Sequence, residues 1–133
     1  MYAEKTIHAL LTAAAPITAL VADRCYAGQL PQATPLPALV VDHISSMLMP
    51  TLDATSGYNI STTRIQVTAL CTSYPAVKNL LQAVKDACAW QRGVIAGVTV
   101  LSIRPDLRGP DGRDDDRSVF YQSLDFTVIF QEP

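Results

Sequence analysis

The densest group of chemically capable side chains lies between residues 104 and 117, in the sequence RPDLRGPDGRDDDR. Of the chain's 10 basic and 12 acidic side chains, four arginines and five aspartates fall in this segment. Gly109, Pro110 and Gly112 predict that the segment is a loop. Its charged members that are candidates for binding a partner are Arg104, Arg108, Asp111, Arg113, Asp114, Asp115, Asp116 and Arg117.

Three interpretations of this charged loop remain open. It is either a solvated hairpin tip or an arm that docks on a neighbouring subunit through Arg–Asp pairs, because a guanidinium group can make two bonds to one carboxylate. The third interpretation is a calcium site, since Asp111, Asp114 and Asp116 offer oxygen ligands. The spacing of a calcium loop and its distal glutamate are missing, however.

Signals for catalysis are weak elsewhere in the chain. His8 and His43 have no sequence neighbour that suggests a catalytic pair. Asp42 precedes His43, but adjacent residues of a strand point to opposite faces. The glycine-containing stretch GVIAGV at 93–98 lacks the pattern and the lysine of a phosphate loop. We therefore expect no enzymatic activity and no cofactor.

The three cysteines, Cys25, Cys71 and Cys88, are odd in number and have no CxxC spacing. This pattern favours small buried thiols of a reduced, intracellular protein over a disulfide framework or a zinc site. We expect no bound metal.

Length and composition exclude further classes of protein. A chain of 133 residues predicts one domain, residues 1–133. The net charge of −2 argues against binding nucleic acid over the whole surface. No stretch approaches the ~18 apolar residues of a membrane-spanning helix, so we expect no membrane partner. The first 22 residues do not resemble a secretory signal, because Thr12 and Pro16 interrupt the apolar run.

The proportion of charged residues is low. It is 17%, whereas about 25% is usual in globular proteins, and 49% of the residues are hydrophobic. So few charges leave much uncharged surface in a monomer. The composition thus favours an oligomer in which part of that surface is buried against other chains.

Apolar periodicity predicts the elements that position these residues. Helices are expected at 4–14, from Pro16 onward and at 75–90, and strands at 38–45, 62–72, 94–104 and 118–131. A proline-rich extended segment, residues 28–37, enters the first strand. One antiparallel or mixed β-sheet with helices packed on one face satisfies these patterns, which is an α+β fold.

Residues 46–61 are predicted to form a long connection or a hairpin arm that projects from the sheet. The first half is apolar and the second half is turn-forming. The apolar members are candidates either for the core or for an exposed, adaptable contact patch. They are Met47, Leu48, Met49 and Leu52.

The order of these features resembles a known family, the tail-terminator or tail-completion proteins of long-tailed bacteriophages and prophages. The resemblance covers about residues 4–132 and rests on hydrophobic and proline punctuation. The segments that carry it are VADRCY at 21–26, LPQ at 30–32, PLPALVV at 35–41, IS at 44–45, RIQV at 64–67, YP at 74–75 and LDFTV at 124–128.

The resemblance implies a structural protein that forms a ring, typically of six copies, at the head-proximal end of the tail in the virion. Such a ring caps the tail tube, stops its polymerisation and offers a surface to the head-tail connector. Its partners are copies of itself, the major tail tube protein and the connector, with assembly in the bacterial cytoplasm. DNA passes through the lumen without specific binding, and a slightly acidic chain suits this because basic side chains would hold phosphates.

Two other functions fit the sequence. One is a small-ligand-binding, regulatory α+β domain with a pocket between sheet and helices. The other is a tail-tube subunit, which would polymerise openly instead of closing into a ring.

Overall fold

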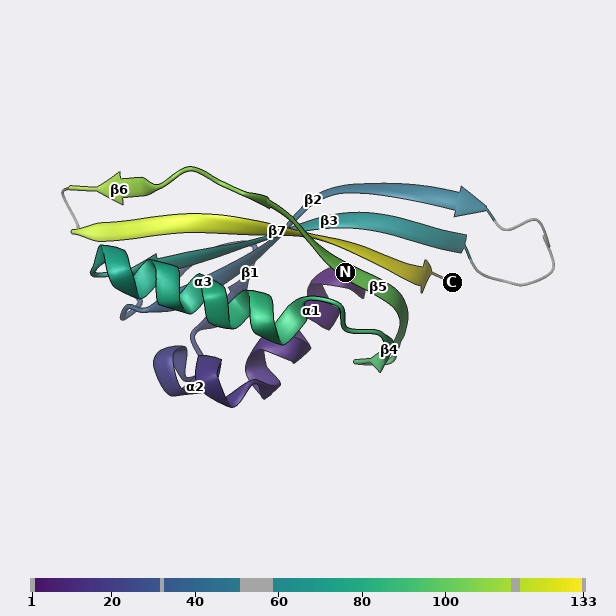
Figure 1. Cartoon of the computed structure of the whole chain (residues 1–133), viewed down its shortest axis with the longest axis horizontal. Coiled ribbons are helices and arrows are strands. Elements are labelled where there is room, and N and C mark those ends of the chain that lie inside the picture. Colours follow the sequence, from purple (N-terminus) through teal and green to yellow (C-terminus); the bar gives the residue numbers. More distant parts are fainter. Residues whose placement is uncertain (1, 32, 51–58, 116–117, 133) are drawn as a thin grey trace.

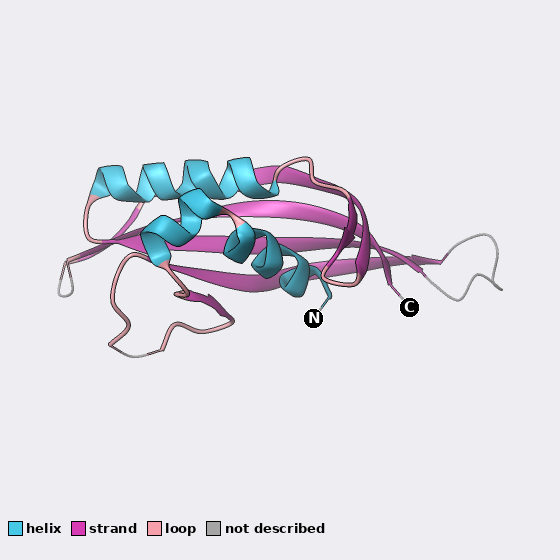
Figure 2. Ribbon diagram, turned by 90° about the horizontal axis from the view of Figure 1, so that it is seen from below, coloured by secondary structure: helices cyan, strands magenta, loops and turns pink. Residues whose placement is uncertain are grey.

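The computed structural model describes residues 2–31, 33–50, 59–115 and 118–132. Three helices pack on one face of a seven-stranded sheet in this part of the chain (Figures 1 and 2). The helices are α1 (Tyr2–Ala13), α2 (Ala15–Val21) and α3 (Tyr74–Cys88). The strands are β1 (Cys25–Ala27), β2 (Ala38–Pro50), β3 (Asn59–Cys71), β4 (Gly93–Ile95), β5 (Val98–Arg108), β6 (Gly112–Asp114) and β7 (Val119–Glu132). The predicted α+β class is confirmed.

Local sequence explains where the helices begin. Pro16 lies in the first turn of α2, where its missing N–H costs no hydrogen bond. Ser73 caps α3 by accepting a hydrogen bond from the Ala76 N–H, and Pro75 follows in the first turn. The buried stripe of α3 is the one that its spacing predicts, and it presses the helix onto the sheet. Its members are Val77, Leu80, Leu81, Val84 and Cys88.

The strand order in the sheet is β1-β2-β3-β7-β5-β4, and β6 pairs with β7 outside this path. β1 and β2 run parallel, whereas the other described pairs are antiparallel. β7 is central because β3 pairs along one side of it while β5 and β6 share the other side. Phe126 is completely buried near the middle of β7 and lies opposite Ile65 of β3. The core therefore lies between this pair of strands and the helices.

The predicted connection at 46–61 is too long. β2 continues through Pro50 and β3 begins at Asn59, so the described residues of this stretch are strand. Twelve antiparallel pairs, from Ala38↔Leu70 to Pro50↔Asn59, hold the two strands together. Backbone hydrogen bonds to β3 thus continue β2 into a region where polar and apolar side chains no longer alternate. The alternative of a projecting hairpin arm is the correct one for the described residues.

The loop predicted at 104–117 is also partly strand. β5 runs to Arg108, and a register shift between Pro105 and Arg108 interrupts its pairing with β7. β6 then resumes the pairing, with Arg113 opposite Phe120. Backbone groups of β7 pair with both β5 and β6. The glycines and proline of the segment predict only turns, so they do not indicate this pairing. The predicted strand at 94–104 likewise divides into β4 and β5 at Ala96 and Gly97.

Candidate interaction surface

The longest run of consecutive, exposed, large apolar side chains among the described residues lies in β2, and we call its residues 44–49 the apolar arm. Met47, Leu48 and Met49 are 67%, 57% and 59% exposed, and Ile44 is 47% exposed. The three side chains of Met47, Leu48 and Met49 are therefore not in the core, and their role as a contact patch stays a prediction. No charged residue occurs between His43 and Pro50.

The arm is exposed because neighbouring elements end before it. β1 pairs only with Leu39, Val40 and Val41 of β2, so in the described structure no strand lies along the outer edge of β2 beyond that point. A register shift between His43 and Ser45 bends the strand. Figure 1 shows β2 and β3 extending past the helices at one end of the molecule.

Hydroxyl groups hold the arm to the neighbouring strand. The Ser46 hydroxyl lies 2.7 Å from the His43 Nε2 and 2.9 Å from the Thr63 hydroxyl. The Thr63 hydroxyl is 3.0 Å from that of Ser61, and both of these residues are buried. This chain of hydrogen bonds fixes the base of the arm, so the exposed methionines project from a supported strand.

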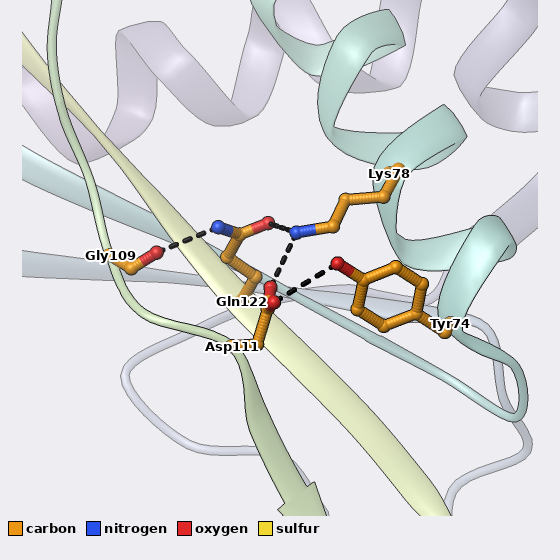
Figure 3. Close-up of polar contacts among 5 residues, drawn as sticks. All are labelled: Tyr74, Lys78, Gly109, Asp111 and Gln122. Atoms are coloured by element: carbon orange, nitrogen blue, oxygen red, sulfur yellow. Dashed lines mark hydrogen bonds and ion pairs between the residues drawn. The ribbon is translucent and has the colours of Figure 1, made fainter.

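The charged segment makes its closest contacts with its own chain. Asp111 accepts hydrogen bonds from the Lys78 ammonium group and, at 3.1 Å, from the Tyr74 hydroxyl, both on α3 (Figure 3). Lys78 also donates to the Gln122 Oε1 at 2.7 Å, and the Gln122 Nε2 donates to the Gly109 carbonyl at 2.7 Å. The network ties the connection between β5 and β6 to the helical layer.

The Lys78–Asp111 contact shifts both pKa values. The hydrogen bond from Lys78 lowers the pKa of the Asp111 carboxyl group, and the same bond raises the pKa of Lys78. Both groups are accessible to water, so the pair orients the segment more than it stabilises the fold.

The other predicted interface residues that the structure describes lie on β5, on β6 and in the segment that follows β6. The Arg113 guanidinium group pairs with Asp115 at 2.5 Å and lies 5.3 Å from the centre of the Phe120 ring. Asp114 lines a hollow, described below, and Arg104 and Arg108 are exposed on β5. Leu52, Asp116 and Arg117 lie outside the described residues.

Sequence reasoning missed a polar cluster on the sheet face opposite the helices. The Arg64 guanidinium donates to Asp125 through Nε at 2.8 Å and Nη2 at 2.5 Å. Asp125 is only 4% exposed, and its Oδ1 has no hydrogen-bond partner among the described residues. Nearby, the Thr127 hydroxyl donates to Asp106 at 2.9 Å. Polar residues alternate with apolar ones in β3 and β7, which indicates a polar face. Only the register between the two strands shows which polar residues contact each other.

The described surface includes two hollows of interest. One, of about 650 Å³, lies between the proline-rich segment and the sheet, and its lining includes Leu30, Leu36, Leu70, Asp114 and Tyr121. The other, of about 440 Å³, lies between the α1–α2 junction and α3. We call the second hollow the helical groove; it is lined by Ala14, Pro16, Asn79, Gln82, Ala83, Asp86 and Ala87.

Within the described ranges, no group of three or more His, Cys, Asp or Glu side chains is arranged to hold a metal ion. The helices that the structure describes all fall short of the length and apolar character needed to cross a bilayer.

Comparison with known proteins identifies the family. The model of the family described as Tail completion protein gp17 matches residues 5–131. The chain belongs to this family. Its resemblance to tail-completion proteins is thereby confirmed, and the tail completion protein gp17 family places the chain among the structural proteins of phage tails.

A solved structure has the same fold. A chain from the "Virion of native gene transfer agent (GTA) particle" superimposes with a TM-score of 0.67 at 19% sequence identity. The match covers 96% of this chain and 93% of the other. No curated protein is similar enough in sequence to match this tail completion family member.

Proposed function

We propose that this tail completion protein closes into a ring at the head-proximal end of the tail tube. The ring, typically of six copies in the resemblance noted above, stops tube polymerisation and presents a surface to the head-tail connector. DNA passes through its lumen without specific binding. In this role the protein performs no catalysis and needs no cofactor.

The observation that carries this proposal is the apolar arm in a member of a tail completion family. Large side chains at 57–67% exposure, on a strand whose outer edge is free, are typical of protein contacts. A closed ring needs contacts between two different patches of neighbouring copies. An arm at one end of the molecule suits such a head-to-tail contact.

The charged segment is the second proposed contact. Asp111, Arg113 and Asp115 are engaged within the chain, so they hold the segment in place. Arg104 and Arg108 are exposed on β5 and carry the charge that a neighbouring carboxylate would meet. Met47, Leu48, Met49 and the two arginines are therefore the residues on which assembly is proposed to depend.

The double variant Met47→Ser/Met49→Ser tests the role of the arm. Native mass spectrometry of the wild-type chain should show a closed species of defined copy number, and the variant should shift to monomer. Its melting temperature should change little, because the replaced side chains are exposed. Val94→Ser is the matched control, since Val94 is a 74% exposed apolar residue on β4.

Two results would contradict the ring. A wild-type chain that stays monomeric at high concentration, both alone and with tail tubes, would exclude self-assembly. Long tubes of the pure protein in electron micrographs would favour the tail-tube subunit.

A further inference from the structure

We infer that the apolar arm of one copy docks in the helical groove of the next copy. This inference rests on the proposed ring and names the surface that receives the arm.

The groove matches the arm in shape and chemistry. Ala83 and Ala87 are one turn apart on α3 and face Ala14 and Pro16 across the hollow. Small side chains on both walls leave room that larger side chains of a partner can fill, as in packed cores where large and small residues face each other. Methionine suits an irregular hollow because its side chain is unbranched and adaptable.

Polarity matches as well. The arm has no charged residue between His43 and Pro50, and the alanines and proline of the groove carry no charge. The polar residues that line the groove are Asn79, Gln82 and Asp86, and the Gln82 amide donates a hydrogen bond to the charged Asp86 carboxylate at 3.0 Å. An apolar centre bordered by polar groups is the usual arrangement of a protein interface.

The groove cannot be filled by the arm of its own chain. Figure 1 places the arm at one end of the long axis and α2 toward the other end, below the sheet. The contact must therefore join two copies. Because the two patches differ, each copy offers one arm and one groove, and the contact repeats around a ring.

A strand-to-strand contact with the free edge of β5 is less suitable. The Trp90 N–H already donates to the Ile103 carbonyl on that edge at 2.6 Å. Pro105 has no N–H to donate, and the register shift that follows distorts the edge. These features protect β5 from pairing with another strand. The arm has no proline before Pro50, and its register shift lies at its base, between His43 and Ser45.

Crosslinking between two single variants tests the inference. Met47→Cys and Ala83→Cys protein are mixed and treated with a short bismaleimide, which joins two accessible thiols. We expect crosslinked dimers in the mixture and almost none with either variant alone. The native cysteines are buried, so the wild-type chain serves as a blank. A mixture of Val94→Cys with Ala83→Cys is the matched control and should give no dimer.

The outcomes separate this inference from the proposed function. Dimers specific to the Met47–Ala83 mixture support the docking. An oligomer by native mass spectrometry without that crosslink overturns the docking but leaves the ring intact. A protein that never assembles overturns the ring and the docking together.

Discussion

At the scale of single residues, buried cysteines behave as apolar core side chains. Burial raises the pKa of Cys25 and Cys71 to about 11 and that of Cys88 to about 12. The thiolate is the reactive form, so it is nearly absent near neutral pH. This explains how an odd number of cysteines occurs here without a disulfide or metal site in the described structure.

We therefore expect the native protein to react very slowly with a thiol-specific chromogenic reagent at pH 8. After unfolding, three thiols per chain should react at once. A control with an exposed Val94→Cys thiol should react rapidly while the chain is folded. Fast reaction of the native wild-type protein would mean that at least one cysteine is accessible.

The Asp111 carboxyl group should titrate below its usual range of about pH 4. Its folded-state pKa is lowered, so its contribution to docking the β5–β6 connection is present above the unfolded pKa and disappears as pH falls through the folded pKa. The pKa of Lys78 is raised, so its contribution to the contact is lost only as pH rises through that raised pKa. The contact is thus complete from mildly acidic to mildly alkaline pH.

A titration followed by NMR at the Asp111 side chain measures this shift. In Lys78→Met protein the midpoint should return toward the ordinary aspartate value, because the donor is gone. Lys85→Met, on the same helix, should leave it low. An unchanged midpoint in Lys78→Met would assign the shift to another group.

At the scale of elements, β6 depends on one close approach. A Cβ on Gly112 would collide with the ring of Tyr121, its register partner on β7. Gly112 is therefore required by packing against an aromatic ring, although the sequence indicated only a loop residue.

Gly112→Ala should destabilise the protein by about 0.5–1.5 kcal/mol, because the partly exposed Tyr121 ring must leave its rotamer to admit the methyl group. Chemical denaturation measures this change. In the double variant Gly112→Ala/Tyr121→Ala the cost of the alanine should largely vanish, because the ring is removed. Equal costs in both backgrounds would show that the collision is not the cause.

The sequence indicated that the helices and strands exist more accurately than it indicated where the strands end. α3 was predicted within about two residues, because a helix closes its hydrogen bonds locally and Ser73 and Pro75 mark its start. The outer half of β2 was assigned to a connection, since its apolar run does not alternate. Its hydrogen bonds come from β3, and that pairing follows the register across the sheet.

At the scale of the whole molecule, the low charge content corresponds to apolar side chains that are exposed on the surface. Consecutive large apolar side chains are exposed on the apolar arm, and others, such as Trp90 and Val94, are exposed elsewhere on the molecule. Composition predicted that some surface would be buried against other chains, and the fold shows which surfaces are exposed and apolar. In the charged segment, Asp111 pairs with Lys78 and Arg113 pairs with Asp115 within the chain, whereas Arg104 and Arg108 are exposed.

The amino-acid sequence by itself determined the class of fold, the main helix, the inward face of the central strands and the resemblance to tail-completion proteins. These follow from periodicity and punctuation, which act over short distances along the chain. Only the tertiary structure decided that Met47, Leu48 and Met49 face solvent, that Asp111 meets Lys78, and that Arg64 meets Asp125. Each of these features depends on strand register or on contacts between residues far apart in sequence. The local spacing of residues does not predict such contacts.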